Sequence, residues 1–109
     1  MSAKGIIVIR AFDRESHLWV NNGSTNKRTV DIVLEHCYEK FKARGHLFLN
    51  EVYSELGIRK TAEGQVAGWI YSDGCAKKTM WTVWMRPNDR NVYITFEPLE
   101  NILHILPHE

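Results

Sequence analysis

The fold of this chain is decided by the stretch LFLNEVYSELGI, residues 47–58, and by its continuation RKTAEGQVAGW. Asn50 is a residue type that caps helix N-termini, and Gly57 suits the left-handed conformation that ends helices. Thr61 is a second N-cap candidate and Gly68 a second stop. We therefore predict two short helices here, joined by a tight turn.

Gly64 lies inside the second of these helices, where a glycine costs roughly 1 kcal/mol of helix propensity. Glycine is the residue that lets another part of the chain approach the backbone closely. A close backbone approach at that point would account for a glycine there.

Upstream of this stretch, apolar residues recur with the spacing of a helix. They fall at i, i+3, i+4, i+7, i+8 and i+11, on one continuous face: Val30, Val33, Leu34, Cys37, Tyr38 and Phe41. Candidates for the N-cap are Thr25, Asn26 and Thr29. Because Gly45 suits the position after the last turn, we predict a long helix over about residues 27–44.

Several segments carry strand patterns instead. The β-branched run in residues 5–11 does not alternate, which predicts a strand covered on both faces. A further short strand is expected at residues 17–20. Residues 80–85 and 92–96 alternate around the turn PNDR, as in a β-hairpin whose Val92, Ile94 and Phe96 face the helices. For Ile102–Leu106 we favour a third strand over a helix.

These patterns predict an α+β fold with one long and two short helices packed on a small antiparallel sheet of three to five strands. The chain has 109 residues, 44% hydrophobic and 25% charged, so we expect a single domain over residues 1–109. Its net charge of +1 provides no long-range field to concentrate a polyanion. The N-terminus lacks the pattern of a signal or a membrane span, which favours a cytoplasmic protein.

A motif within these elements resembles a group of small uncharacterised proteins encoded by phages, prophages and Gram-positive bacteria. It consists of LNEVY (49–53), LGI (56–58), Thr61, GQV (64–66) and GW (68–69), followed by the strand YITF (93–96). The likeness covers about residues 28–106. It implies an α+β domain whose helices precede a short antiparallel sheet, and it implies no activity, so no functional residues are carried over.

Patterns for catalysis or metal binding are weak. The five histidines are scattered, without H-E-x-x-H or a two-Cys, two-His spacing. Cys37 and Cys75 lack C-x-x-C spacing, so we interpret them as free thiols rather than a disulfide. Cys75, beside Gly74, is conceivable as a nucleophile, but a small residue in a turn is the favoured interpretation. We expect no metal and no cofactor, and we lean against an enzyme.

The strongest candidate for a binding site is KKTMWTVWMR, residues 77–86. Trp81 and Trp84 are three residues apart, so on a strand they face opposite sides. One of them is then exposed beside arginine and methionine, a composition typical of protein-binding hot spots. Large aromatic residues are more often found in the core, which is the competing interpretation. The candidate partner-binding residues are Trp81, Trp84, Met85, Arg86, Tyr53 and Trp69.

The leading functional hypothesis is therefore a non-catalytic protein-interaction module. The resemblance suggests a phage or prophage accessory protein whose partner is a phage or host protein, such as a defence component, and self-association is a further option. One alternative is a nucleic-acid binder with a helix-turn-helix-like unit at residues 50–68. Its candidate contacts are Arg59, Lys60, Gln65, Lys77 and Lys78. Another alternative is a ligand pocket or active site that joins Cys75 or a histidine to the tryptophans.

Overall fold

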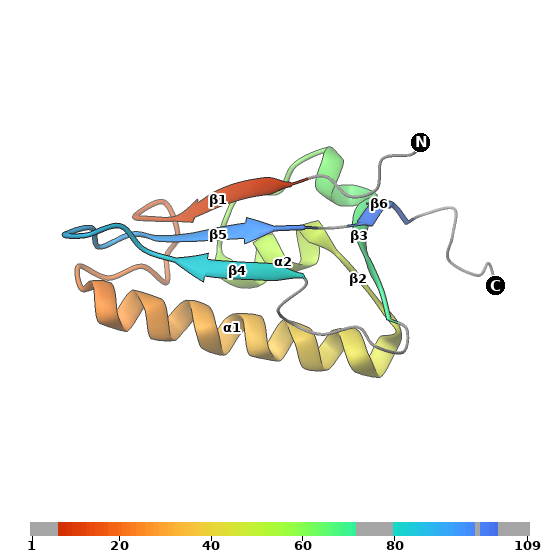
Figure 1. The fold of residues 1–109 in the computed structure, drawn as a ribbon, viewed down its shortest axis with the longest axis horizontal. Coiled ribbons are helices and arrows are strands. Elements are labelled where there is room, and N and C mark those ends of the chain that lie inside the picture. Colours follow the sequence, from red (N-terminus) through yellow and green to blue (C-terminus); the bar gives the residue numbers. More distant parts are fainter. Residues whose placement is uncertain (1–6, 72–79, 98, 103–109) are drawn as a thin grey trace.

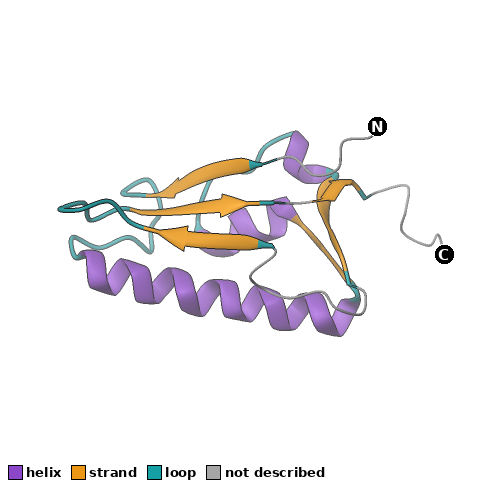
Figure 2. Ribbon diagram, in the orientation of Figure 1, coloured by secondary structure: helices purple, strands orange, loops and turns teal. Residues whose placement is uncertain are grey.

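In a computed structural model of the protein, the described residues are 7–71, 80–97 and 99–102 (Figure 1). They form two helices, one 3-10 turn and two three-stranded antiparallel sheets (Figure 2). The elements in chain order are β1 (Val8–Phe12), α1 (Gly23–Arg44), β2 (His46–Phe48), α2 (Leu49–Leu56), η1 (Glu63–Gln65), β3 (Ala67–Ile70), β4 (Trp81–Trp84), β5 (Val92–Phe96) and β6 (Leu99–Asn101). The predicted α+β class is confirmed.

The strands divide into two sheets instead of the single sheet that the sequence predicted. The main sheet has the order β1-β5-β4, and the second sheet has the order β2-β3-β6. The predicted hairpin is confirmed, because β4 and β5 pair antiparallel with Trp84 opposite Tyr93 and Trp81 opposite Phe96. Its turn contains Asn88 at φ 61°, a residue type that tolerates this left-handed conformation.

Helix α1 begins at Gly23, four residues before the predicted start. The side chain of Asn22 caps it by accepting a hydrogen bond from the backbone N–H of Thr25, so the three proposed N-caps were wrong. Asn26, one of those three, is completely buried. At the other end Gly45 has φ 88° and its N–H donates to the Phe41 carbonyl, which confirms the predicted stop.

The second short helix that the sequence predicted is only the 3-10 turn η1. Thr61 does bind the backbone at the start of this turn, since the Thr61 hydroxyl accepts a hydrogen bond from the N–H of Gly64 at 2.9 Å. The turn cannot extend, because Gly68 already belongs to β3, where it pairs with Phe48. Only Val66 therefore lies between η1 and β3.

Asn50 has a different role from the helix cap that the sequence suggested. Helix α2 starts at Leu49, with Phe48 at the N-cap position two residues before Asn50, and Glu51 accepts from the Phe48 N–H. The Asn50 side chain instead binds both the N–H and the carbonyl of Thr61, each at 2.9 Å. A Cβ on Gly64 would lie 2.2 Å from the Asn50 side-chain oxygen, which confirms the expected close approach.

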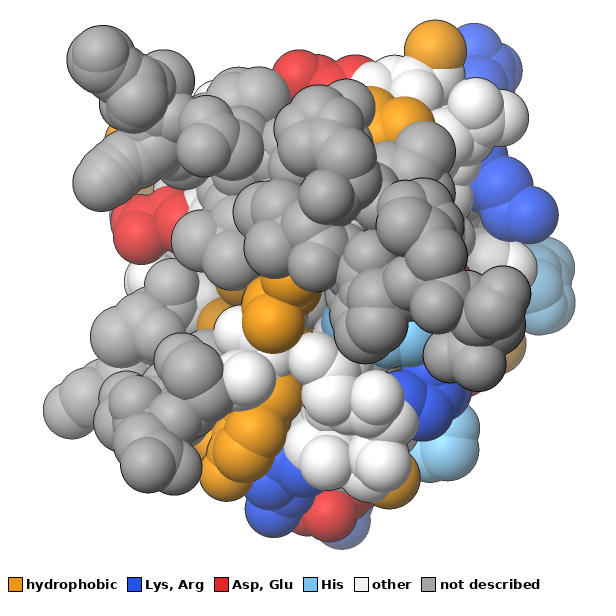
Figure 3. Space-filling model, turned by 90° about the vertical axis from the view of Figure 1, so that its right-hand side faces the viewer, with side chains coloured by type: hydrophobic (Ala, Val, Ile, Leu, Met, Phe, Trp, Pro, Cys, Tyr) orange, Lys and Arg blue, Asp and Glu red, His pale blue; other side chains and the backbone are white. Residues whose placement is uncertain are grey.

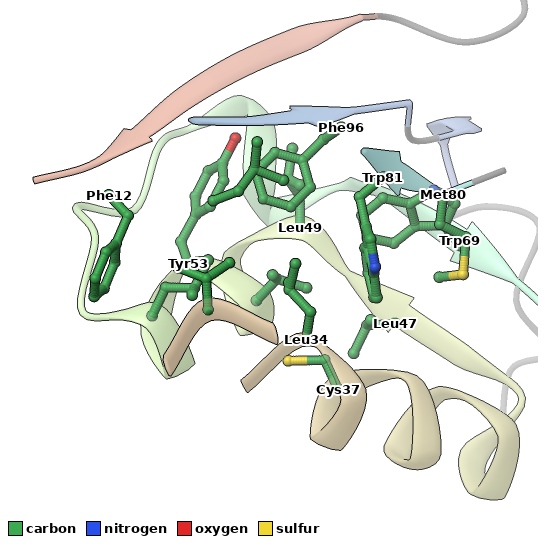
Figure 4. Close-up of a cluster of buried hydrophobic side chains, with 14 of the residues drawn as sticks. Phe12, Leu34, Cys37, Leu47, Leu49, Tyr53, Trp69, Met80, Trp81 and Phe96 are labelled. Atoms are coloured by element: carbon green, nitrogen blue, oxygen red, sulfur yellow. The ribbon is translucent and has the colours of Figure 1, made fainter. Parts of the chain in front are cut away.

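The core lies between the inner face of the main sheet and the helices (Figure 4). Val92, Ile94 and Phe96 are fully buried, as predicted. The rings of Trp69 and Trp81 meet edge-on at 5.5 Å and 89°, which joins the second sheet to the main sheet. Trp, Tyr and Phe rings in such T-shaped contacts add to the stabilisation from burial alone.

Strand β1 differs from its prediction, because it is covered on one face only. Ile9 is 57% exposed and Ile7, just before the strand, is 68% exposed. Both helices pack against the inner face of the main sheet, so the residues of β1 that alternate with the inward-facing ones have no cover. Residues 17–20 form no strand. Of the predicted strand 102–106, only Ile102 is among the described residues; it is buried and follows β6.

None of the described helices combines the length and the apolar character needed to span a membrane.

We predict that Gly64→Ala lowers the free energy of unfolding by about 1–3 kcal/mol, because the added methyl group overlaps the Asn50 side chain. The penalty should shrink in an Asn50→Ala background, where that side chain is absent. Urea unfolding of the four proteins in a double-mutant cycle measures the coupling. Strictly additive costs would show that Asn50 does not occupy this space.

Candidate functional site

The outer face of the main sheet consists of the side chains that alternate with the buried ones. Strand register aligns them in two cross-strand rows, Ile9–Thr95–Thr82 and Ala11–Tyr93–Trp84. Of these, Ile9, Thr82 and Trp84 are exposed, and the other three are half-buried. We call these six residues and the neighbouring Ile7 the outer face. It is a surface of apolar and hydroxyl side chains, with an aromatic pair at one end.

Trp84 is the largest exposed side chain of this face, and its position is fixed by contacts. Its ring stacks on Tyr93, with centroids 4.9 Å apart and planes at 24°. Its indole N–H donates to the Thr95 hydroxyl at 2.9 Å. The side chain is therefore held at the surface with 36% of its area exposed.

Arg86 and Asp89 complete this arrangement at the hairpin turn. The Arg86 guanidinium lies 4.7 Å from the centre of the Tyr93 ring and donates to the Tyr93 hydroxyl. That hydroxyl donates to Asp89 at 2.7 Å, and Arg86 Nε donates to the same carboxylate oxygen at 3.2 Å. We call Trp84, Arg86, Asp89 and Tyr93 the Trp84 cluster.

The charges of the cluster stabilise one another. The N–H of Asn91 donates to Asp89 at 2.9 Å and is the largest cause that lowers the pKa of this carboxyl, followed by Tyr93. The hydrogen bond to Tyr93 is the main cause that raises the pKa of Arg86. Both groups are therefore ionised at neutral pH and neutralise each other. The cluster presents aromatic area and hydrogen-bonding groups without a net charge.

The predicted partner-binding residues separate into two groups in the structure. Trp81, Trp69 and Tyr53 are at most 6% exposed and belong to the core, so they are not part of a surface. Met85 is half-buried and packs against that core. Trp84 and Arg86 are exposed, and both contact the Tyr93 ring. The expectation that the two tryptophans of β4 face opposite sides is confirmed.

Tyr93 and Asp89 were not among the predicted site residues, although the sequence contained a signal for Tyr93. It alternates with the three buried residues of β5, which already places it on the same face as Trp84. Asp89 was recognised only as a turn residue. Its role depends on the hairpin register, which brings it within reach of Tyr93.

The residues proposed to contact nucleic acid do not form a recognition helix. Arg59, Lys60 and Gln65 are exposed, but Gln65 ends the single turn η1, which is too short to lie along a groove. Lys77 and Lys78 lie outside the described residues. In the view of Figure 3, the described basic side chains lie apart from one another, mostly on the right and at the bottom, with uncharged and histidine side chains between several of them.

The alternative of a reactive cysteine can be examined only at Cys37, because Cys75 lies outside the described residues. Cys37 is a free thiol, as expected, and it is completely buried. Burial, reinforced by the nearby Glu55 carboxylate, raises its pKa to about 12. Cys37 therefore stays protonated at neutral pH and is unsuited to act as a nucleophile.

The hollows among the described residues are lined mostly by polar side chains. One of about 320 Å³ lies between the loop after β1 and the β4–β5 turn, and is lined by Asp13, Arg14, Trp19, Asn21, Asn88, Asp89, Arg90 and Asn91. Trp19 is tied to Asn91 by its indole N–H at 3.1 Å. Among the described residues that line it there is no cysteine or histidine. Within the described part of the chain, no three His, Cys, Asp or Glu residues come together as metal ligands would.

We predict that Cys37 in a Cys75→Ser protein does not react with a thiol reagent at about pH 8, because its thiol is buried and protonated. Denaturant should restore full reactivity, as the thiol then returns to its ordinary pKa of 9.0. Absorbance of the released chromophore measures both rates. Rapid labelling of the folded protein would contradict the packing of α1.

We predict that Tyr93→Phe raises the pKa of Asp89 toward its ordinary value of 3.8, because the change removes one of its donors. Because folding lowers the pKa of Asp89, its hydrogen bonds stabilise the folded protein above pH ~4, and this stabilisation is lost as the pH falls below that value. Carboxyl NMR titration of both proteins makes the comparison. An unchanged pKa would show that the hydroxyl does not bind Asp89 in solution.

Comparison with known proteins gives a family but no functional relative. No curated protein and no solved structure shows significant similarity to the chain. A family of unknown function (DUF6353) matches residues 3–106, almost the whole length. This agrees with the likeness to uncharacterised proteins that the sequence motif suggested. The chain therefore belongs to the DUF6353 family of unknown function.

Proposed function

We propose that this protein is a non-catalytic protein-interaction module that binds its partner through the outer face of the main sheet. The observation that carries this proposal is the Trp84 cluster. Trp, Tyr and Arg are the residues that most often dominate the energy of protein interfaces, and here one of each lies in contact at the surface.

The fixed conformation of the side chains in the Trp84 cluster favours binding. An exposed tryptophan or arginine normally loses side-chain entropy when it is immobilised in an interface, about 0.5–1.5 kcal/mol for each flexible side chain. In this protein stacking and hydrogen bonds already hold Trp84 and Arg86. Much of that cost is therefore met during folding, so a larger part of the contact energy remains for binding.

The neighbouring surface supplies apolar area around this anchor. Ile7 and Ile9 are the most exposed apolar side chains of the outer face, and Ile9 lies in the cross-strand row next to that of Trp84. Because the cluster itself carries no net charge, the partner needs no strongly charged surface. An apolar patch with a few hydrogen-bonding groups fits this face best.

We further propose a phage or prophage origin, a cytoplasmic location, and a host protein such as a defence component as the partner. The origin and the partner rest on the resemblance of the 49–69 motif and on the small size of the chain, and the location rests on the pattern of the N-terminal residues. Family membership is consistent with them but assigns no activity.

We predict that Trp84→Ala stays folded but loses its partner. Truncation of a hot-spot tryptophan costs about 2 kcal/mol or more, roughly 30-fold in affinity. Tagged proteins are used to capture partners from a Gram-positive lysate with and without nuclease, and the bound material is identified by mass spectrometry. Ile32→Ala is the matched control, since it also truncates an exposed apolar side chain (61%), but on α1.

Two results would contradict the proposal. One is equal capture by Trp84→Ala and the wild type, which would exclude the cluster as the anchor. The other is nucleic acid that co-purifies and is released by salt, which would favour the nucleic-acid alternative. Trp81→Ala serves as a reference for a core defect and should lower the free energy of unfolding by about 3–5 kcal/mol.

A further inference from the structure

Strand β1 is an open edge of the main sheet. It pairs with β5 on one side over all five of its residues, from Val8 opposite Phe96 to Phe12 opposite Val92. On its other side it makes no backbone hydrogen bond to any part of the chain that the structure describes. Figure 1 shows β1 at the border of the sheet, with no strand beyond it. A row of backbone donors and acceptors therefore remains free for another strand.

The edge has one feature that can protect such strands, an inward-pointing charge at Arg10, but the contacts of Arg10 hold that charge within the fold, and other protective features are absent. It has no proline and no bulge, and its register with β5 is continuous. Its one charged residue, Arg10, turns inward, with its guanidinium 4.3 Å from the Tyr53 ring centre and a hydrogen bond of 3.0 Å to the Arg59 carbonyl. The remaining residues of the edge are apolar, and Ile9 is more than half exposed.

Space is also available beside the strand. A hollow of about 220 Å³ lies against it, lined by Arg10, Ala11, Asp13, Glu15, Ser16 and Ile58. The other edges of the two sheets are shorter: β4 has four residues, and β2 and β6 have three each. Of the described edge strands, β1 thus offers the longest run of free backbone groups.

We propose that two copies of this chain pair through β1, antiparallel, about a two-fold axis at Ile9. This register places Ile9 opposite Ile9 of the second copy, and Ile7 opposite Ala11. Arg10 then lies opposite Val8, so the two positive charges do not face each other. A register centred on Arg10 would put the two guanidinium groups directly opposite, which is unfavourable.

The pairing would join the two main sheets into one sheet of six strands. A two-fold axis perpendicular to the sheet keeps both outer faces on the same side, with the isoleucines in the middle and a Trp84 cluster toward either end. This inference concerns the backbone edge of β1, whereas the proposed function is carried by the Trp84 cluster; Ile9 belongs to both surfaces. Trp84→Ala separates the two proposals, because it should lose the partner and keep the dimer.

Sedimentation velocity from about 1 to 100 μM tests the dimer. The wild type is expected at twice the 12.7 kDa of one chain. Ile9→Lys should weaken the dimer by roughly tenfold or more, because two like charges then meet at the axis. Ile32→Lys makes the same change at an exposed site on α1 and should remain a dimer, as should Trp84→Ala. A wild type that is monomeric throughout, or an Ile9→Lys dimer of unchanged strength, overturns the proposal.

Disulfide trapping tests the register in a Cys75→Ser background. Residues directly opposite in an antiparallel pair have Cα atoms about 4.5–5.5 Å apart, within reach of a disulfide. Ile9→Cys should therefore form a covalent dimer under mild oxidation. Ile7→Cys, although more exposed, should not, because the two sulfur-bearing residues would be about 13 Å apart at roughly 3.3 Å per residue. Equal trapping of the two variants, or faster trapping of Ile7→Cys, contradicts this pairing.

Discussion

The edge-to-face packing of aromatic rings beneath the main sheet is the interaction on which the rest of the structure depends. Trp81 on β4 meets Trp69 on β3 at 5.5 Å, and Tyr53 on α2 meets Phe96 on β5 at 5.7 Å. The Trp69 indole N–H is satisfied by the Glu97 carbonyl at 3.0 Å. These contacts join both sheets and α2, and they decide which face of β4 and β5 is the inner one. Once Trp81 points inward, the period of the strand sends Trp84 outward.

Polar side chains fix the connections around this core. The Asn26 side chain accepts a hydrogen bond from the Val20 N–H and donates to the carbonyls of Val20 and Arg90. The start of α1 is therefore tied to the β4–β5 turn. At the other end of α1, Arg44 forms a bidentate ion pair with Glu51 of α2. Burial tends to raise the pKa of Glu51, but the hydrogen bonds from Arg44 and Phe48 and the nearby positive charges outweigh it and lower that pKa.

Local and periodic signals in the sequence predicted much of the fold. The spacing of Val30, Leu34 and Cys37 identified α1, and the alternation of β5 identified both the hairpin and its buried face. The unusual glycine at position 64 correctly indicated a close approach. Those features depend on residues that are near one another in the chain, and their physical causes can be inferred without a structure.

Features that depend on distant contacts were not accessible in this way. The β-branched run at the start of the chain suggested a strand buried on both faces, but only the register with β5 reveals that Ile9 faces outward. Asn50 has the chemistry of a cap, and its actual partner, Thr61, lies eleven residues away. The binding hypothesis included Trp84 and Arg86, which are exposed and both contact Tyr93, but it also included three core residues, since composition alone does not distinguish the two faces of a strand.

The central claim is that β4 holds one tryptophan in the core and presents the other on an ordered outer face. The most direct test is the relaxation that a soluble gadolinium chelate causes in the four indole N–H signals of the protein. The account predicts strong broadening for Trp84, weak broadening for Trp69 and Trp81, and an intermediate effect for the half-buried Trp19. Broadening of Trp81 equal to that of Trp84, or protection of Trp84 equal to that of Trp69, would contradict the arrangement of faces on which the account rests.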